Sequence, residues 1–220
     1  MKAAVLVAIL AIPWGALAQG IGSGFWVDTL NIVGTKAVLL SWAEGLDLPE
    51  EAREELSAML GELPNLVPVP LVGIFLGIPL GPVELQLAGA LLTDGLLRNV
   101  GLWPAYGMDL AESLHLDFML RAYHLALGVS PRLDLGFVAF ALAAGLSLSG
   151  GDLSLQVATD EEKLGWGAIG GTLGARLELG LPFLRLFASG AIFFPWGQVQ
   201  DAWNVRVGPW QGAMGVVIRF

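Results

Sequence analysis

The sequence has no cysteine and few charged residues. The absence of cysteine excludes disulfides, thiol catalysis and thiolate metal sites. Charged residues make up 14% of the chain, whereas a soluble domain carries about 25%. Hydrophobic residues reach 55%, and the mean hydropathy is +0.69. The chain therefore lacks the surface charge of a soluble protein, which indicates a membrane protein or a surface that something else covers.

Basic residues are also scarce. The formal net charge is −9, and no basic patch is available to neutralise phosphates, so a nucleic-acid partner is not expected. The 30 glycines and 12 prolines are too many for a bundle of long helices, because both residue types weaken helix interiors. They suit short strands joined by turns.

Residues 1–18 have the pattern of a secretory signal peptide. Lys2 supplies the positive charge, 3–12 is an apolar run, and residues 16–18 read Ala-Leu-Ala, a cleavage-site pattern. An uncleaved anchor is the alternative, but about 11 apolar residues are too few to span a bilayer as a helix. We expect this segment to be removed and leave it out of the fold.

The segment 19–65 is expected to be partly helical. Residues 20–34 are ambiguous between a strand and the start of a helix, and Thr35–Trp42 is compatible with a helix. An acidic amphipathic helix is expected to start near Asp47, with Pro49 in its first turn, and to end near Gly61. Its apolar stripe predicts either packing on a neighbouring element or a plug or periplasmic cap for a barrel. Its acidic face makes binding to an anionic membrane surface an unfavourable alternative.

The last residues, 209–220, alternate as an extended strand does. Met214, Val216, Ile218 and Phe220 share one apolar face, and Arg219 lies on the other. A strand of this kind that ends on an aromatic residue resembles the closing strand of bacterial outer-membrane β-barrels. The resemblance implies that the barrel-insertion machinery reads Phe220 as a membrane-insertion signal, and that outer-membrane lipid surrounds the protein.

Similar alternation recurs through 66–220, with Gly, Pro, Ser and Asp at the breaks. It predicts one domain, an all-β antiparallel up-and-down transmembrane barrel of about eight strands. The expected strands are 66–80, 82–93, 114–128, 131–148, 151–158, 164–180, 182–196 and 207–220. The long connection 94–112 then falls on the side where turns are usually short. A further strand at 20–33 or 96–106, giving about ten strands, therefore stays open.

The charges inside these strands avoid the leucine-rich face. A helix would scatter them around its circumference, whereas a strand places them on one side. We therefore expect a face in lipid and a face in a polar lumen. The proposed lumen-lining residues are Glu84, Asp117, Arg121, Arg132, Asp134, Arg176, Glu178 and Arg185, and Arg219 follows the same pattern.

Two other architectures are compatible with parts of the pattern. A soluble secreted β-barrel or sandwich that binds an apolar ligand would also alternate, with its apolar face inward. A helical inner-membrane protein could use the apolar runs 66–83 and 135–151. The glycines, prolines and alternation count against helices, and the sparse polar face counts against a water-soluble surface.

No residue set assembles an active site, so an enzyme is not expected. Ser113, His115 and Asp117 share one strand face, but successive members would lie about 6–7 Å apart, too far for a hydrogen bond. The other histidine, His124, lies on the opposite parity, near the expected membrane interface, so the two histidines do not predict a metal site. No cofactor is expected, and no small-molecule substrate is identified.

Two functions stay open. The barrel is either a structural or anchoring protein whose lumen is closed by ion pairs, or a path for small solutes or hydrophobic compounds across the outer membrane. An interior of eight strands is barely wide enough for side chains, which favours the closed barrel.

Overall fold

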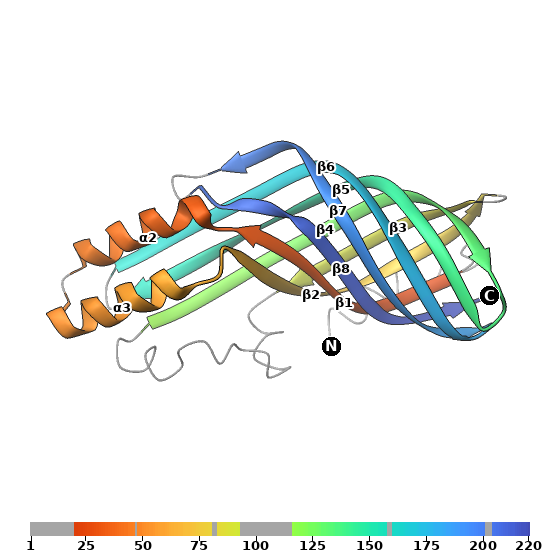
Figure 1. The fold of residues 1–220 in the computed structure, drawn as a ribbon, viewed down its shortest axis with the longest axis horizontal. Coiled ribbons are helices and arrows are strands. Elements are labelled where there is room, and N and C mark those ends of the chain that lie inside the picture. The colour runs from red at the N-terminus through yellow and green to blue at the C-terminus, as the bar shows by residue number, and fades with distance from the viewer. Residues whose placement is uncertain (1–19, 47, 81–82, 93–115, 158–159, 201–203) are drawn as a thin grey trace.

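The computed structural model describes residues 20–46, 48–80, 83–92, 116–157, 160–200 and 204–220. Eight strands close into one antiparallel barrel in which each strand pairs with its chain neighbours and β8 pairs with β1 (Figure 1). The elements are β1 (Gly20–Asn31), α2 (Val33–Gly45), α3 (Glu50–Glu62), β2 (Leu66–Leu80), β3 (Val83–Leu92), β4 (Leu116–Asp134), β5 (Val138–Val157), β6 (Asp160–Leu181), β7 (Leu184–Gln200) and β8 (Arg206–Arg219).

The predicted eight-stranded barrel is confirmed, but two of its strands differ from the expected ones. β1 is a full barrel strand that pairs with both β2 and β8, so the expected boundary of the barrel at residue 66 is wrong. The expected strands 131–148 and 151–158 are not separate, because β4 continues to Asp134 and β5 runs unbroken from Val138 to Val157. The further strand left open at 20–33 is thus present, and the one at 96–106 lies outside the described residues. The count stays at eight because the expected strands 131–148 and 151–158 were one strand too many.

Close packing explains why β5 does not turn at Gly150 and Gly151. A Cβ on Gly150 would lie 2.5 Å from the Tyr123 hydroxyl, and a Cβ on Gly151 would lie 2.4 Å from Cζ2 of Trp166. The two glycines thus leave room for rings from the neighbouring strands β4 and β6. The actual turn between β4 and β5 is at residues 135–137, where Gly136 has a φ of +85°, a value that favours glycine.

The helices lie at one end of the barrel. The turns β2–β3, β4–β5 and β6–β7 are short and share the other end with the C-terminus, and we call that end the turn end. The opposite end, where β1 leads into α2 and α3 returns to β2, is the helix end. Gly20 and Arg219, which pair with each other, therefore lie at the opposite end of the barrel from the helices. β3 ends at Leu92 and β4 begins at Leu116 at the helix end, so the long connection between these strands does not conflict with the short turns at the other end.

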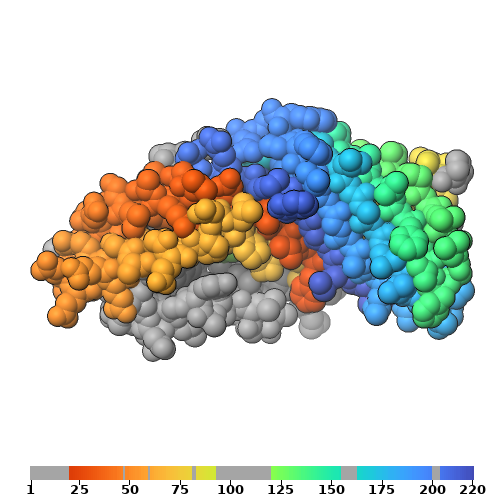
Figure 2. Space-filling model, in the orientation of Figure 1, coloured from red at the N-terminus to blue at the C-terminus, as the bar shows by residue number. Residues whose placement is uncertain are grey.

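Helices α2 and α3 form a hairpin that projects from the barrel, as the orange elements of Figure 1 and Figure 2 show. The predicted α3 is confirmed, and Asp47, its expected start, lies outside the described residues. Leu39 and Ala43 of α2 and Leu56 and Leu60 of α3 are buried in one apolar cluster with the barrel interior. Neither helix, within the described part of the chain, is long and apolar enough to cross a membrane.

The outer surface of the barrel is apolar. Leu142, Leu186 and Met214 point away from the lumen with 64%, 65% and 63% of their surface exposed. Many other leucines, valines, isoleucines and phenylalanines of the strands are exposed in the same way. A soluble barrel or sandwich would bury these side chains, so this surface requires a hydrocarbon environment.

The apolar face changes sides near the helix end. Tyr123 and Leu125 of β4 face outward, but Leu120 packs into the interior cluster while Arg121 is exposed. β6 shows the same change, with Leu164 buried inside and Lys163 exposed. The parts of these strands near the helix end thus have the pattern of a barrel in water. We infer that they project from the membrane.

Candidate functional site

Seven charged residues meet in the lumen near the turn end. They come from five strands and carry four guanidinium groups and three carboxylates. We call this set the ion-pair cluster: Glu84 of β3, Arg132 and Asp134 of β4, Arg176 and Glu178 of β6, Arg185 of β7 and Arg219 of β8. It joins strands that are far apart around the barrel.

Glu178 is the centre of the cluster, with only 1% of its surface exposed. Its carboxylate accepts a hydrogen bond from Nη2 of Arg132 at 3.2 Å and another from Nη2 of Arg219. Nε of Arg176 lies 3.0 Å from Oε1, and Nη1 of Arg185 lies 3.8 Å from Oε2. All four arginines of the cluster therefore share this carboxylate.

The other two carboxylates each hold two of the same arginines. Glu84, which is 2% exposed, accepts from Nη2 of Arg176 at 2.9 Å and from Nη1 of Arg219. Asp134, at the rim, accepts from Arg132 at 2.7 Å and from Arg185 at 3.0 Å. Every arginine thus contacts two carboxylates, a connected network of charge-assisted hydrogen bonds.

Glycines on β1 and β2 make room for this network. A Cβ on Gly77 would lie 2.6 Å from Cδ of Glu84, and a Cβ on Gly20 would lie 2.8 Å from Nη1 of Arg219. Side chains from the other strands therefore fill the space that the inward positions of these two strands leave open.

Six of the eight residues proposed from sequence belong to the ion-pair cluster. Arg121 does not. It is exposed on the outer face of β4, on the same side of the strand as the outward-facing Tyr123 and Leu125. The expectation is wrong because it took the leucine-rich positions of 114–120 as the lipid face. The side chain of Asp117 lies outside the described residues. Arg219 was not in the proposed lumen set, although its position in the alternation indicated an inward side chain. It contacts both Glu84 and Glu178.

An aromatic layer follows the cluster on the way to the helix end. The Arg176 guanidinium lies 4.7 Å from the centre of the Phe75 ring, and Phe75 meets Phe187 edge-on at 5.2 Å. The Trp26 and Phe187 ring centres are 6.2 Å apart. A cavity of about 130 Å³ lies here among these residues and His124.

A buried polar group faces this region. Nδ1 of His124 lies 3.1 Å from Oδ2 of Asp28 and 2.9 Å from Oγ of Ser149, and Nε2 of Gln211 donates to Ser149 at 3.4 Å. A hydrolytic triad places the acid and the serine on different ring nitrogens, but here both contact Nδ1. No local sequence pattern indicates this group, because its members are far apart in the chain, and His124 was expected near the membrane interface.

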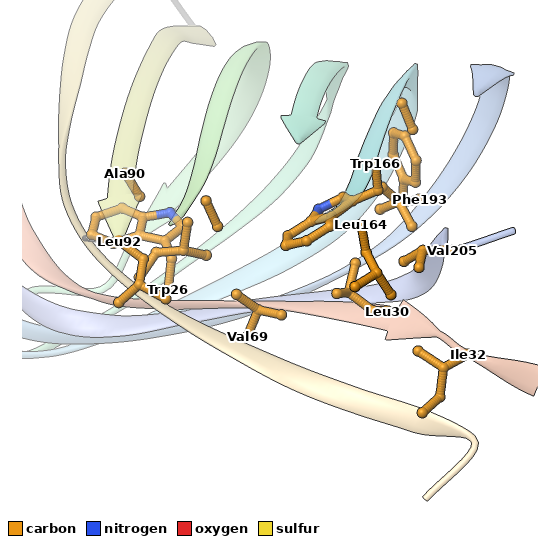
Figure 3. Packing of buried hydrophobic residues seen from close by; sticks show 14 of the residues in the cluster. Trp26, Leu30, Ile32, Val69, Ala90, Leu92, Leu164, Trp166, Phe193 and Val205 are labelled. Carbon is orange, nitrogen blue, oxygen red and sulfur yellow. The ribbon is translucent and has the colours of Figure 1, made fainter. Parts of the chain in front are cut away.

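The lumen near the helix end is filled with apolar side chains. Leu30, Val69, Leu92, Leu164, Trp166 and Phe193 converge from different strands, as Figure 3 shows. Each is buried. Trp166 is part of this core, whereas Trp196 and Trp210 are exposed on the outer surface. The lumen thus contains paired charges near one end and apolar packing near the other.

The triad considered at 113–117 lies outside the described side chains. Within the described residues, no group of three or more His, Asp or Glu side chains could hold a metal ion.

These features define the class of the protein. A closed barrel satisfies every backbone group without water, its outer surface is apolar, and its inward charges are paired. An even number of strands, short turns at one end and longer connections at the other are the features of bacterial outer-membrane barrels. The chain is a transmembrane β-barrel of the bacterial outer membrane.

Solved structures with a similar fold are known at low identity. Ail, the attachment invasion locus protein of Yersinia pestis, is 13% identical, with 91% of this chain and 97% of that chain covered and a TM-score of 0.49. A major outer membrane protein of Thermus thermophilus is 14% identical, with 90% and 99% covered and a TM-score of 0.48. Neisserial surface protein A is 10% identical, with 92% and 98% covered and a TM-score of 0.47. No family model and no curated protein matches the sequence. Similarities at this level carry no argument about function.

Proposed function

We propose that this protein is a closed structural barrel that anchors the α2–α3 hairpin on the outer side of the outer membrane. The turn end faces the periplasm, since periplasmic turns of such barrels are short. The helix end, with its long connections, then faces outward. The barrel holds the hairpin through the apolar cluster that α2 and α3 share with the lumen.

The ion-pair cluster carries this proposal. Four guanidinium groups, three of them buried, and their carboxylates span the lumen from five strands. A buried charge is costly to separate from its partner, by several kcal/mol in typical proteins. Solute passage would require several such pairs to separate, so closure is the state that the geometry favours.

The apolar half of the lumen supports the same function. Its interior is filled by the protein's own side chains rather than left open for a hydrophobic compound. Passage of a hydrophobic substrate would have to displace Trp166, Phe193 and their neighbours. We therefore favour the anchoring function over transport.

The remaining expectations are part of the same proposal. The proposal includes no catalysis, and in the one triad-like group described above His124 presents a single ring nitrogen to both Asp28 and Ser149. The insertion machinery reads Phe220, which follows β8 with 73% of its surface exposed. No cofactor or small-molecule substrate is required.

Conductance across a planar lipid bilayer tests closure. The purified protein is inserted, and its folding is checked by the faster migration of an unboiled sample in an SDS gel. We expect the gel shift without stable channel steps. Steady single-channel conductance from a preparation that shows the shift would contradict the closed barrel and favour solute passage.

A further inference from the structure

The turn end of the barrel exposes large apolar side chains, although turns in proteins are usually polar. Five of them have 51–65% of their surface exposed, and we call this set the turn tips: Leu80, Leu135, Phe137, Leu181 and Phe183. In the described part of the chain, every charged side chain within five residues of a turn tip belongs to the ion-pair cluster. An exposed group of large apolar side chains indicates contact with something other than water.

Side chains of the lumen satisfy the backbone of these turns. In the β4–β5 turn, N of Gly136 donates to Oδ1 of Asp134 at 2.9 Å, and O of Gly136 accepts from Nη2 of Arg185 at 2.6 Å. In the β6–β7 turn, O of Leu181 accepts from Nε of the same Arg185 at 3.3 Å. Arg185 thus donates to both turns from the lumen side.

The backbone of neighbouring segments satisfies further groups of the turns. O of Phe137 accepts from N of Gly180 at 2.9 Å, and O of Phe183 accepts from N of Arg219 at 3.0 Å. Backbone groups of a turn in water can bond to the solvent, whereas a bilayer offers them no partner. These turns therefore have the internal hydrogen bonds that a lipid environment requires.

The apolar outer surface has the length needed to place the turn tips at a membrane boundary. On the side of the helix end, the outward apolar face of β4 begins at Tyr123. Leu135 follows Tyr123 by 12 residues. This separation is roughly 40 Å along a strand and roughly 30 Å across the membrane at a tilt of about 40°. A hydrocarbon core is about 30 Å thick, so the turn tips reach its opposite boundary and do not project beyond it.

We propose that the turn end is a lipid-binding surface, with the turn tips inserted into the periplasmic leaflet where acyl chains meet headgroups. Lipid is the partner because the turn tips continue the outward apolar surface of the strands, as Leu133 and Leu184 next to them are also exposed. Arg185 has two tasks, since it closes the ion-pair cluster and satisfies the turns that enter lipid. The assignment to the periplasmic leaflet rests on the orientation in the proposed function.

Fluorescence quenching in vesicles of phosphatidylcholine and phosphatidylglycerol tests this surface. Single cysteines replace Phe137 or Phe183 and carry an environment-sensitive fluorophore. One quencher is a nitroxide on the upper acyl chain of a lipid, and the other is iodide, supplied on both sides of the membrane. We expect quenching by the nitroxide, and an iodide quenching constant several-fold smaller than that of a control label at Glu55 on the exposed face of α3. A label at Leu142, on the outer surface of β5, is the control for a position in lipid.

Two results would overturn the proposal. Iodide quenching equal to that at Glu55 would place the turn tips in water. Protection from both quenchers would mean that protein, such as a second copy of this chain, covers them. The gel shift verifies folding of each labelled protein, and labels at Leu135 and Leu181 give the same decision if a phenylalanine variant does not fold. Because iodide is present on both sides, the result depends on neither orientation nor conductance, and failure here leaves the bilayer test of closure unaffected.

Discussion

Replacing Glu178 by glutamine should strongly destabilise the barrel. Glu178 contacts all four arginines of the ion-pair cluster, and it is almost fully buried. After Glu178→Gln, Arg176 and Arg219 share only Glu84, and Arg132 and Arg185 share only Asp134. The network thus divides into two groups, each with two positive charges and one negative charge.

The expected loss follows from the burial of these charges. Breaking a buried ion pair by removing one partner costs about 3–5 kcal/mol, because the other charge stays buried without compensation. We expect a loss in this range for Glu178→Gln and a smaller loss for Glu84→Gln, since the two arginines of Glu84 keep Glu178. Adding Arg219→Leu to Glu178→Gln restores the balance of charges and should recover part of the loss.

Urea unfolding in phospholipid vesicles, followed by tryptophan fluorescence, measures these differences. Glu55→Gln on the exposed face of α3 makes the same chemical change away from the lumen and should alter stability by no more than about 0.5 kcal/mol. A Glu178→Gln protein as stable as the Glu55→Gln control would refute the buried network.

Three further results are expected. Gly151→Val should lose about 1–3 kcal/mol in the same assay, because its side chain would collide with Trp166, while Gly190→Val, in open space, should be nearly neutral; equal effects would contradict the packing of β5. Leu146→Arg, near the middle of the apolar surface, should cost about 2–4 kcal/mol, and Val199→Arg, near the helix end, about 0–1 kcal/mol; a reversed order would contradict the placement in the membrane. Glu178→Gln should remain non-conducting in a planar bilayer, because the apolar half of the lumen still closes it, and stable channels would show that the ion-pair cluster is the only seal.

The regular alternation of local residues was enough to predict the barrel. In β6, the positions Leu173, Leu177 and Leu179 face outward while Arg176 and Glu178 face the lumen, as their parity required. The closing strand followed the same rule, with Ile218 outward and Arg219 inward. In a strand that lies between lipid and a narrow lumen, every second residue faces lipid and the residues between them face the lumen.

The errors arose where the environment changes along a strand. Arg121 was expected in the lumen because the apolar positions of 114–120 were assumed to face lipid. In the part of β4 that projects from the membrane, the apolar side chains face the interior instead. β1 stayed an open alternative at 20–33 because its glycines supply space for Phe75 and Arg219, a signal that only the neighbouring strands explain. The contacts of Asp28 with His124 depend on two strands far apart in the sequence, which no local pattern reveals.

Depth measurements on spin labels along β5 test the account most directly, and the absence of native cysteine makes single-cysteine labelling clean. Labels at Leu142 and Leu148 should be relaxed mainly by oxygen, which concentrates in hydrocarbon, and a label at Asp152 mainly by a water-soluble nickel complex. A label at the lumen position Ala143 should be reached poorly by both reagents. Equal access of the nickel complex to residues 142, 148 and 152 would contradict a barrel that crosses the membrane with this face in lipid.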